Sequence, residues 1–360
     1  MNTLIGCPAE TEWHESRVAV TPEVVGRLRR AGLELIVEAG AGRRAGFPDE
    51  AYVAAGACVA DRSEVFAEAD ILTVIHRPDC QRLRAGQIVI GLLDPYDDPD
   101  ELADVTALSF EGLPRTLSRA QSMDVLTSQA NVAGYKAAVL AADTFGGFFP
   151  MMMTAAGTVR PAKVLVLGGG VAGLQAIGTA RRLGALVTGY DVRAAARADI
   201  ASTGAAVLDL DLSAEGEGGY ARMLTAEEQA GQQRALVNAI RDFDVVITTA
   251  QVPGHRPPEL VPAEALAALA PGSVVVDLAA GPLGGNVAGS VPDSRTETAN
   301  GVVVLGAGNL AAQVPRAASS AWAHNVTALL EYLIHDGSVV LDPEDEITAG
   351  LLVQSKEAVS

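Results

Sequence analysis

The chain has 360 residues, more than a single hydrophobic core usually serves, so its length favours two domains. Hydrophobic residues make up 49% of the sequence but aromatic residues only 4%, so the cores must be built from Ala, Val and Leu, which suits parallel α/β proteins. The formal net charge of −18 disfavours nucleic acid and anionic membrane surfaces as partners.

The first third of the chain alternates apolar runs with helix-like segments. Strands are predicted at residues 3–7, 33–38, 71–75, 87–92 and 105–110. A helix is predicted over residues 21–31, with Thr21 as the N-cap, Pro22 at the first helical position and Gly32 as the stop. This βαβ pattern indicates a parallel sheet.

An Ala-rich segment without proline, residues 122–145, has helical periodicity and is expected to cross into a second domain that begins near Phe149. Strands of that domain are predicted at residues 163–167, 186–190, 245–249, 273–278 and 302–305. A further helix over about 316–334 is expected to return to the first domain. Residues 212–233 are polar and glycine-containing, which favours a solvated loop.

These elements predict an α/β chain of two Rossmann-like doubly wound parallel-sheet domains, joined by two long helices with a cleft between them. The first domain is expected to comprise residues 1–130 and 318–360, and the second residues 131–317, with the loop at about 212–233 inside it.

A glycine motif follows the predicted strand at 163–167. Gly168, Gly170 and Gly173 have G-x-G-x-x-G spacing and open a predicted helix at 171–183. Such glycines allow a tight turn, close approach of a pyrophosphate and close helix packing, and the helix N-terminus favours phosphate. Asp191 lies about 20 residues on, where a carboxylate binds the adenosine ribose of NAD(H). The alternative is a tight βα turn that binds nothing.

Other features narrow the class of protein. Cys7, Cys58 and Cys80 are scattered without metal-site spacing, so neither a metal centre nor a disulfide framework is expected. The first ten residues lack a basic region followed by an apolar run, so no signal peptide is expected. No apolar stretch reaches the ~20 residues that span a bilayer, so we expect a soluble protein without direct membrane insertion.

Four segments carry a family resemblance. They are FFPMMMTAAGTVRPAKVLVLGGGVAGLQAIGTARRLGA (148–185), PRTLSRAQSMDVLTSQANVAGYKA (114–137), ITTAQVPGHRPP (247–258) and EGGYA (217–221). Together they resemble the NAD(H)-binding component of the alpha subunit of proton-translocating NAD(P) transhydrogenases. The related alanine dehydrogenases share the fold and the glycine motif but not this combination.

The resemblance implies direct hydride transfer between NAD(H) on this chain and NADP(H) bound by a partner subunit. It also implies coupling to proton translocation through membrane partners, namely a membrane-spanning alpha part and an NADP(H)-binding beta subunit. The family includes split forms, and this chain is similar to the first portion of the alpha subunit. A homodimer is implied, located in the cytoplasm and held peripherally on the inner face of the cytoplasmic membrane through those subunits.

The family's catalytic loop corresponds to Arg115, Gln121 and Asp124. Because hydride transfer makes and consumes no proton, these residues are expected to position groups rather than act as acids or bases. Gln121 can both donate and accept a hydrogen bond, and is expected to fix the nicotinamide end of NAD(H) and to reach the partner nucleotide. The alternative is an N-cap network in which Ser118 or Ser122 caps the long helix.

The resemblance also implies a set of cofactor-binding residues. They are Thr127, Gly168, Gly170, Val171, Ala172, Gly173, Asp191, Val192, Arg193, Gly219, Tyr220, Gln232, Ala250 and Gln251. Tyr220 matches the tyrosine of a mobile loop that is expected to close over bound nucleotide. Thr127 stands where the family usually has serine, and Gln251 where it more often has leucine. Asp191 favours NAD(H) over NADP(H) by charge, although Arg193 nearby could accept a 2′-phosphate.

Two other functions stay open. An amino-acid dehydrogenase of the alanine dehydrogenase type needs acid–base groups, and the corresponding strands here offer only His76, which is expected to be a polar residue at a strand end. Arg17 matches a substrate-binding arginine of that enzyme, but is expected to be structural here, paired with Glu10 or Glu15. A non-catalytic NAD sensor would also keep the glycine motif.

Overall fold

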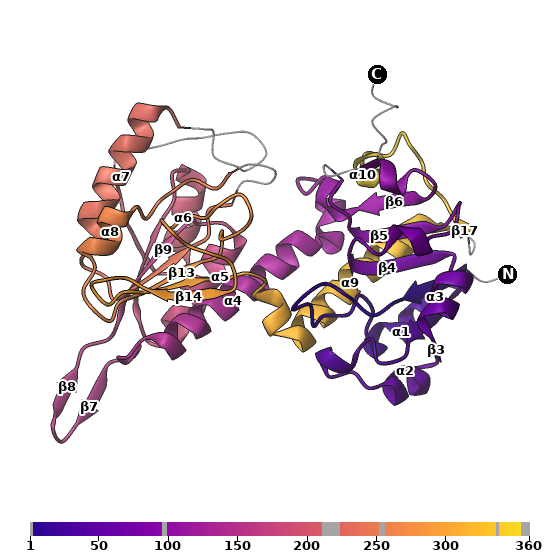
Figure 1. Ribbon diagram of the computed structural model, residues 1–360, viewed down its shortest axis with the longest axis horizontal. Coiled ribbons are helices and arrows are strands. Elements are labelled where there is room, and N and C mark those ends of the chain that lie inside the picture. Colours follow the sequence, from indigo (N-terminus) through magenta and orange to yellow (C-terminus); the bar gives the residue numbers. More distant parts are fainter. Residues whose placement is uncertain (1–2, 96–98, 211–223, 252–255, 336–337, 354–360) are drawn as a thin grey trace. The chain divides into compact units, whose positions relative to one another are not determined.

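The computed structural model describes residues 3–95, 99–210, 224–251, 256–335 and 338–353. The chain divides into two compact units: unit 1 is formed by residues 1–129 and 311–360, and unit 2 by residues 130–310. Helix α4 (Val125–Thr144) runs from unit 1 into unit 2, whereas α9 (Pro315–Leu333) belongs to unit 1 (Figure 1).

Unit 1 is built on a six-stranded sheet in the order β3-β2-β1-β4-β5-β6, in which every pair of neighbours is parallel. Its strands are β1 (Thr3–Cys7), β2 (Leu33–Glu38), β3 (Cys58–Ala60), β4 (Ile71–His76), β5 (Ile88–Leu92) and β6 (Thr106–Ser109). Its helices besides α9 are α1 (Pro22–Arg30), α2 (Asp49–Ala55), α3 (Arg62–Glu68) and α10 (Glu346–Leu351). Strands β16 (Ile334–His335) and β17 (Ser338–Val339) form a small antiparallel pair.

Both faces of this sheet are covered. Alternate side chains of a strand point to opposite faces, so Ile71 packs with α1 and α9 around the buried Trp322, while Leu72 packs with Val65 and Phe66 of α3. Helix α1 begins at Pro22 as expected; Thr21 is its N-cap residue, although the Thr21 side chain forms no capping hydrogen bond.

Unit 2 is built on a seven-stranded sheet in the order β11-β10-β9-β12-β13-β15-β14, parallel except for the antiparallel edge strand β14. The strands are β9 (Lys163–Leu167), β10 (Leu186–Tyr190), β11 (Ala206–Val207), β12 (Val245–Thr248), β13 (Val274–Asp277), β14 (Ser294–Glu297) and β15 (Val303–Gly306). The helices are α5 (Val171–Arg182), α6 (Ala194–Ser202), α7 (Ala226–Ile240) and α8 (Ala263–Ala268). A hairpin of β7 (Met152–Thr154) and β8 (Gly157–Val159) precedes β9.

The unit 2 sheet is also covered on both faces. Val164 and Val166 of β9 pack with α4 and α5, and Leu165 between them packs with α7 and α8. The prediction of two doubly wound parallel sheets is therefore confirmed. Among the helices of the described ranges, none combines the length and apolar character needed to cross a bilayer.

One predicted loop is wrong in part. Residues 226–233 of the predicted loop 212–233 form the first two turns of α7. The Thr225 side chain accepts a hydrogen bond from the Glu228 backbone N–H, and the Glu228 side chain accepts one from the Thr225 N–H, so a capping box starts this helix. The sequence T-A-E-E carried that signal, but the polar composition around it favoured a loop.

Candidate functional site

The glycine turn of unit 2 joins β9, the strand between β10 and β12, to α5. Gly168 has a φ of +112°, which favours glycine, and a Cβ on Gly173 would lie 1.8 Å from the Gly168 carbonyl oxygen. A Cβ on Gly170 would meet no heavy atom within 4 Å, so the turn borders open space there. Val171 and Ala172 begin α5, whose first N–H groups have no partner within the helix.

Asp191 follows β10 directly and is 7% exposed. Its Oδ2 accepts hydrogen bonds from the Gly169 N–H and Arg193 Nη2, both at 2.8 Å. Its Oδ1 accepts from the Arg193 N–H at 2.8 Å and from Arg193 Nε at 2.9 Å. Burial opposes ionisation of this carboxyl group, but the hydrogen bonds from Arg193 and Gly169 outweigh it and hold the pKa of Asp191 below its usual value.

The chain after β12 forms the third side of this turn. The Thr249 hydroxyl lies 3.2 Å from the Gly168 carbonyl oxygen, to which it donates. Ala250 is held by the buried Asn286, which accepts from the Ala250 N–H and donates to its carbonyl oxygen. Sequence reasoning missed Asn286, because its role depends on a loop that returns from β13. Gln251 donates to the Leu278 carbonyl oxygen at 2.7 Å.

Two other predicted cofactor contacts fall differently. Gln232 lies on α7, is 6% exposed and donates to the Tyr190 hydroxyl at 3.0 Å. Gly219 and Tyr220 lie outside the described residues.

In unit 1, Arg115, Asp124 and Thr127 form one hydrogen-bonded group. Arg115 donates through Nε to Asp124 Oδ2 at 2.9 Å and through Nη2 to the Thr127 hydroxyl at 2.8 Å. Asp124 accepts from the Thr127 N–H at 2.9 Å, directly before α4 begins at Val125. Asp124 is therefore the residue that caps the long helix.

The alternative of capping by Ser118 or Ser122 is wrong, because both lie inside a 3₁₀ helix over Ser118–Met123. The exposed Gln121 is in the same 3₁₀ helix, and its side chain forms no hydrogen bond with the described residues. Asn325 of α9 donates to the Ser122 carbonyl oxygen at 2.7 Å, so α9 supports the backbone next to Gln121.

Comparison with known proteins decides the family. The alanine dehydrogenase/PNT N-terminal domain family matches residues 6–133, and the corresponding C-terminal domain family matches residues 137–360. The chain belongs to the alanine dehydrogenase/PNT family.

Relatives within this family include both kinds of protein. The first portion of the split NAD(P) transhydrogenase subunit alpha of Rickettsia prowazekii (strain Madrid E) is 39% identical over 355 residues, covering 94% of this chain and 91% of that protein. The structure of transhydrogenase from Sinorhizobium meliloti shares 40% identity over 97% of both chains, with a TM-score of 0.87. An L-alanine dehydrogenase structure shares 26% identity over 97% of this chain and 94% of that one, with a TM-score of 0.79. The resemblance to transhydrogenases that the sequence motifs carry is confirmed.

Because the family contains alanine dehydrogenases, the charged groups after β1 and β4 of unit 1 also matter. Arg17 is 4% exposed; it donates to both carboxylate oxygens of Glu15 and, through Nη1, to Gln129 Oε1 at 2.8 Å. His76, at the end of β4, places Nε2 2.9 Å from Glu15 Oε2. The prediction that Arg17 is structural and paired is confirmed, with Glu15 rather than Glu10 as its partner. This guanidinium is thus committed to protein groups.

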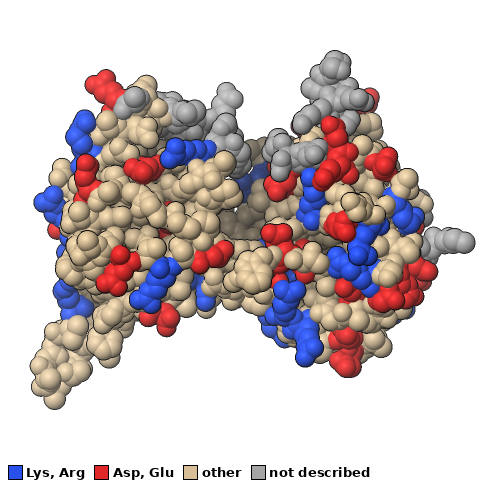
Figure 2. All heavy atoms as spheres, in the orientation of Figure 1, with Lys and Arg blue, Asp and Glu red and all other residues tan. Residues whose placement is uncertain are grey.

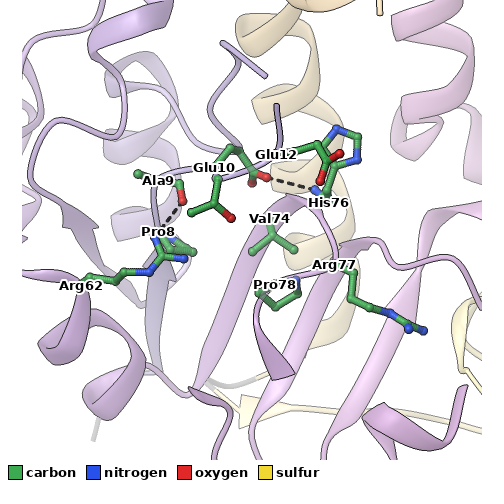
Figure 3. A pocket seen from close by; sticks show the side chains of 10 residues that line it. Pro8, Ala9, Glu10, Glu12, Arg62, Val74, His76, Arg77 and Pro78 are labelled. Carbon is green, nitrogen blue, oxygen red and sulfur yellow. Dashed lines mark hydrogen bonds between the residues drawn. The ribbon is translucent and has the colours of Figure 1, made fainter. Parts of the chain in front are cut away.

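A small pocket lies beside this cluster (Figure 3). It is lined by Pro8, Ala9, Glu10, Thr11, Glu12, Arg62, Val74, His76, Arg77 and Pro78. Glu10 accepts hydrogen bonds from the N–H groups of Ile75, at 2.6 Å, and His76, at 3.3 Å. Burial raises the pKa of Glu10 to about 7 despite these bonds. Burial opposes protonation of His76, but the Glu15 carboxylate outweighs it and raises the pKa of the imidazole.

Proposed function

We propose that this chain is the NAD(H)-binding component of a proton-translocating NAD(P) transhydrogenase. In this reaction a hydride passes directly between NAD(H) on this chain and NADP(H) on a partner subunit. The observation that carries the proposal is the Arg115–Asp124–Thr127 group beside Gln121, whose amide bonds to none of the described residues, in a chain that also carries an open glycine turn. A protein that only binds or senses NAD would not need such a loop.

The residues of unit 2 fit a dinucleotide. The space at Gly170 leaves room for a pyrophosphate beside the N-terminus of α5, where Val171 and Ala172 would line it. Asp191, Val192 and Arg193 would bind the adenosine side. The remaining contacts are proposed for Ala250, Gln251 and Gln232, with Gly219 and Tyr220 on a loop that closes over the nucleotide.

The role of the unit 1 loop is positioning. NAD(H) supplies the hydride chemistry, so the protein must hold the nicotinamide rather than donate or accept protons. Asp124 fixes Arg115 and caps α4, which makes the base of the loop rigid. Gln121 keeps both an N–H donor and a carbonyl acceptor for the nicotinamide end of NAD(H) and for the partner nucleotide. An alanine dehydrogenase activity is disfavoured by the commitment of Arg17 to Glu15 and Gln129.

Reduction of an NAD analogue by NADH tests this function. The chain is mixed with the NADP(H)-binding subunit and catalytic NADP(H). Turnover should require both proteins, and Gln121→Ala should lower it about 100-fold, because misplaced reacting groups cost rates of that order. The NADH dissociation constant should stay at the wild-type value. Ser122→Ala, the exposed neighbour, is the control and should keep full turnover. An unaltered rate in Gln121→Ala would contradict the assignment.

We propose further that the chain assembles as a homodimer with a membrane-spanning alpha part and an NADP(H)-binding beta subunit, on the inner face of the cytoplasmic membrane. The β7–β8 hairpin supports the dimer. Met151 and Met153 are 58% and 75% exposed, and residues 151–159 carry no charge. Figure 2 shows this hairpin free of charged side chains. An isolated two-stranded hairpin is only marginally stable, and two copies with a charge of −18 each can approach where charge is absent.

Sedimentation equilibrium of Met153→Asp tests the dimer. The buried charge should shift the chain to monomers, while Leu283→Asp, at another exposed apolar residue of unit 2, should leave the dimer intact. A Met153→Asp protein that stays dimeric would place the interface elsewhere.

A further inference from the structure

The carboxylate of Asp191 has no acceptor site left for a ligand. An ionised carboxylate offers about four lone-pair sites. Four N–H groups fill them here: the backbone N–H groups of Gly169 and Arg193, and Nε and Nη2 of Arg193. A ribose hydroxyl can bind Asp191 only if one of these donors leaves.

Only one of the donors can leave without unfolding its element. The Gly169 N–H belongs to the turn between β9 and α5, and the Arg193 N–H to the N-cap of α6. The Arg193 side chain, in contrast, is 22% exposed and can leave by rotation about its own bonds. The neighbouring Arg197 is held elsewhere, by the carbonyl oxygens of Asp191 and Val192.

We propose that Arg193 is the residue through which this site chooses between NAD(H) and NADP(H). The ionised Asp191 holds the guanidinium in a bidentate ion pair and releases it only to the two ribose hydroxyls of NAD(H). Without that carboxylate, Arg193 would bind the 2′-phosphate of NADP(H). This inference rests on the proposed binding of NAD(H) at the glycine turn.

The chemistry of the two ligands explains the choice. A guanidinium binds phosphate as readily as carboxylate, with the same two parallel N–H···O contacts. While the ion pair is intact, a 2′-phosphate meets the Asp191 charge and must also separate that pair from its arginine. The burial of Asp191 and its depressed pKa keep the carboxylate charged at neutral pH. The charge of Asp191 therefore acts twice, by repelling the phosphate and by withholding the arginine that would bind it.

Binding of NADH and NADPH to the full chain, followed by nicotinamide fluorescence, tests the proposal. In Asp191→Asn, NADH should bind about tenfold more weakly and NADPH at least about tenfold more tightly than in the wild type, which is the scale of one charge-assisted hydrogen bond. The double variant Asp191→Asn with Arg193→Gln should lose the gain in NADPH affinity. Equal NADPH binding by the single and double variants would overturn the role of Arg193.

Arg193→Gln alone keeps the test independent of how well Asp191→Asn folds. Its NADH affinity should stay within about threefold of wild type, because the side chain that is removed competes with the ribose and does not hold it. A loss of tenfold or more would show that Arg193 binds NAD(H) directly and would overturn the proposal. Failure of the wild-type chain to bind NADH would instead refute the proposed function, and the inference with it.

Discussion

The two units place the same crevice at the middle of a parallel sheet and treat it in opposite ways. In unit 1 the central strand β1 lies between β2 and β4, and in unit 2 β9 lies between β10 and β12. A glycine turn leads from β9 directly into α5, whereas a long connection with the buried Glu10 and Glu15 separates β1 from α1. A shared strand order therefore fixes where a ligand can bind, and the residues after the central strand decide whether backbone or side chains face it.

The buried charges of unit 1 provide the strongest test of this difference. Glu10 has a pKa of about 7 in the folded chain and 4.5 as its ordinary value, so the folded state binds the extra proton between these pH values. Its contribution to stability is therefore complete below about pH 4.5 and is lost as the pH rises to 7. The expected loss is about 3 kcal/mol of unfolding free energy.

Glu10→Gln should remove this loss, so its unfolding free energy should fall less than that of the wild type between pH 5 and pH 8. Denaturant unfolding across that range measures the difference. His76 loses its charge above its ordinary pKa in both proteins, and Glu15 stays ionised throughout, so neither changes the comparison. Glu12→Gln, an exposed glutamate of the same pocket, should follow the wild-type curve. Parallel curves for all three proteins would show that Glu10 is not the buried acid.

Much of the fold could be predicted, because strands of a doubly wound sheet are short apolar runs with polar ends. The expected bounds of β1, β2, β9 and β10 are the observed ones. The N-terminal part of α7 could not be recognised from composition, since its capping box lies in a polar, glycine-containing stretch. Apolar periodicity identifies an element by the face it buries, and the first turns of α7 offered too little of one.

The site was predicted to a different depth in each unit. The glycine spacing fixed the turn after β9, because each glycine answers a local steric demand. The pairing of Asp191 with Arg193 and the capping of α4 by Asp124 needed three-dimensional structure, since several neighbouring side chains could have made the same bonds. Asn286, which reaches Ala250 from 36 residues away, left no local signal.

Two glycines of the unit 2 turn sharpen the comparison, because one is surrounded by backbone and the other faces open space. Gly173→Ala places a methyl group 1.8 Å from the Gly168 carbonyl oxygen, so the turn must shift, at a cost of about 1–3 kcal/mol of stability. Gly170→Ala meets no atom and has a φ of −79°, so its stability should fall by about 1 kcal/mol or less.

NADH affinity should nevertheless fall at least about tenfold in Gly170→Ala, because the new methyl group takes the space beside the N-terminus of α5 that a pyrophosphate would enter. Thermal unfolding and NADH titration of both variants separate the two effects. A Gly170→Ala chain that binds NADH as tightly as the wild type would mean that the open space is not the phosphate site. The contrast between the units would then lie only in packing, since the glycine turn of unit 2 would serve the approach of α5 to β9 and not that of a ligand.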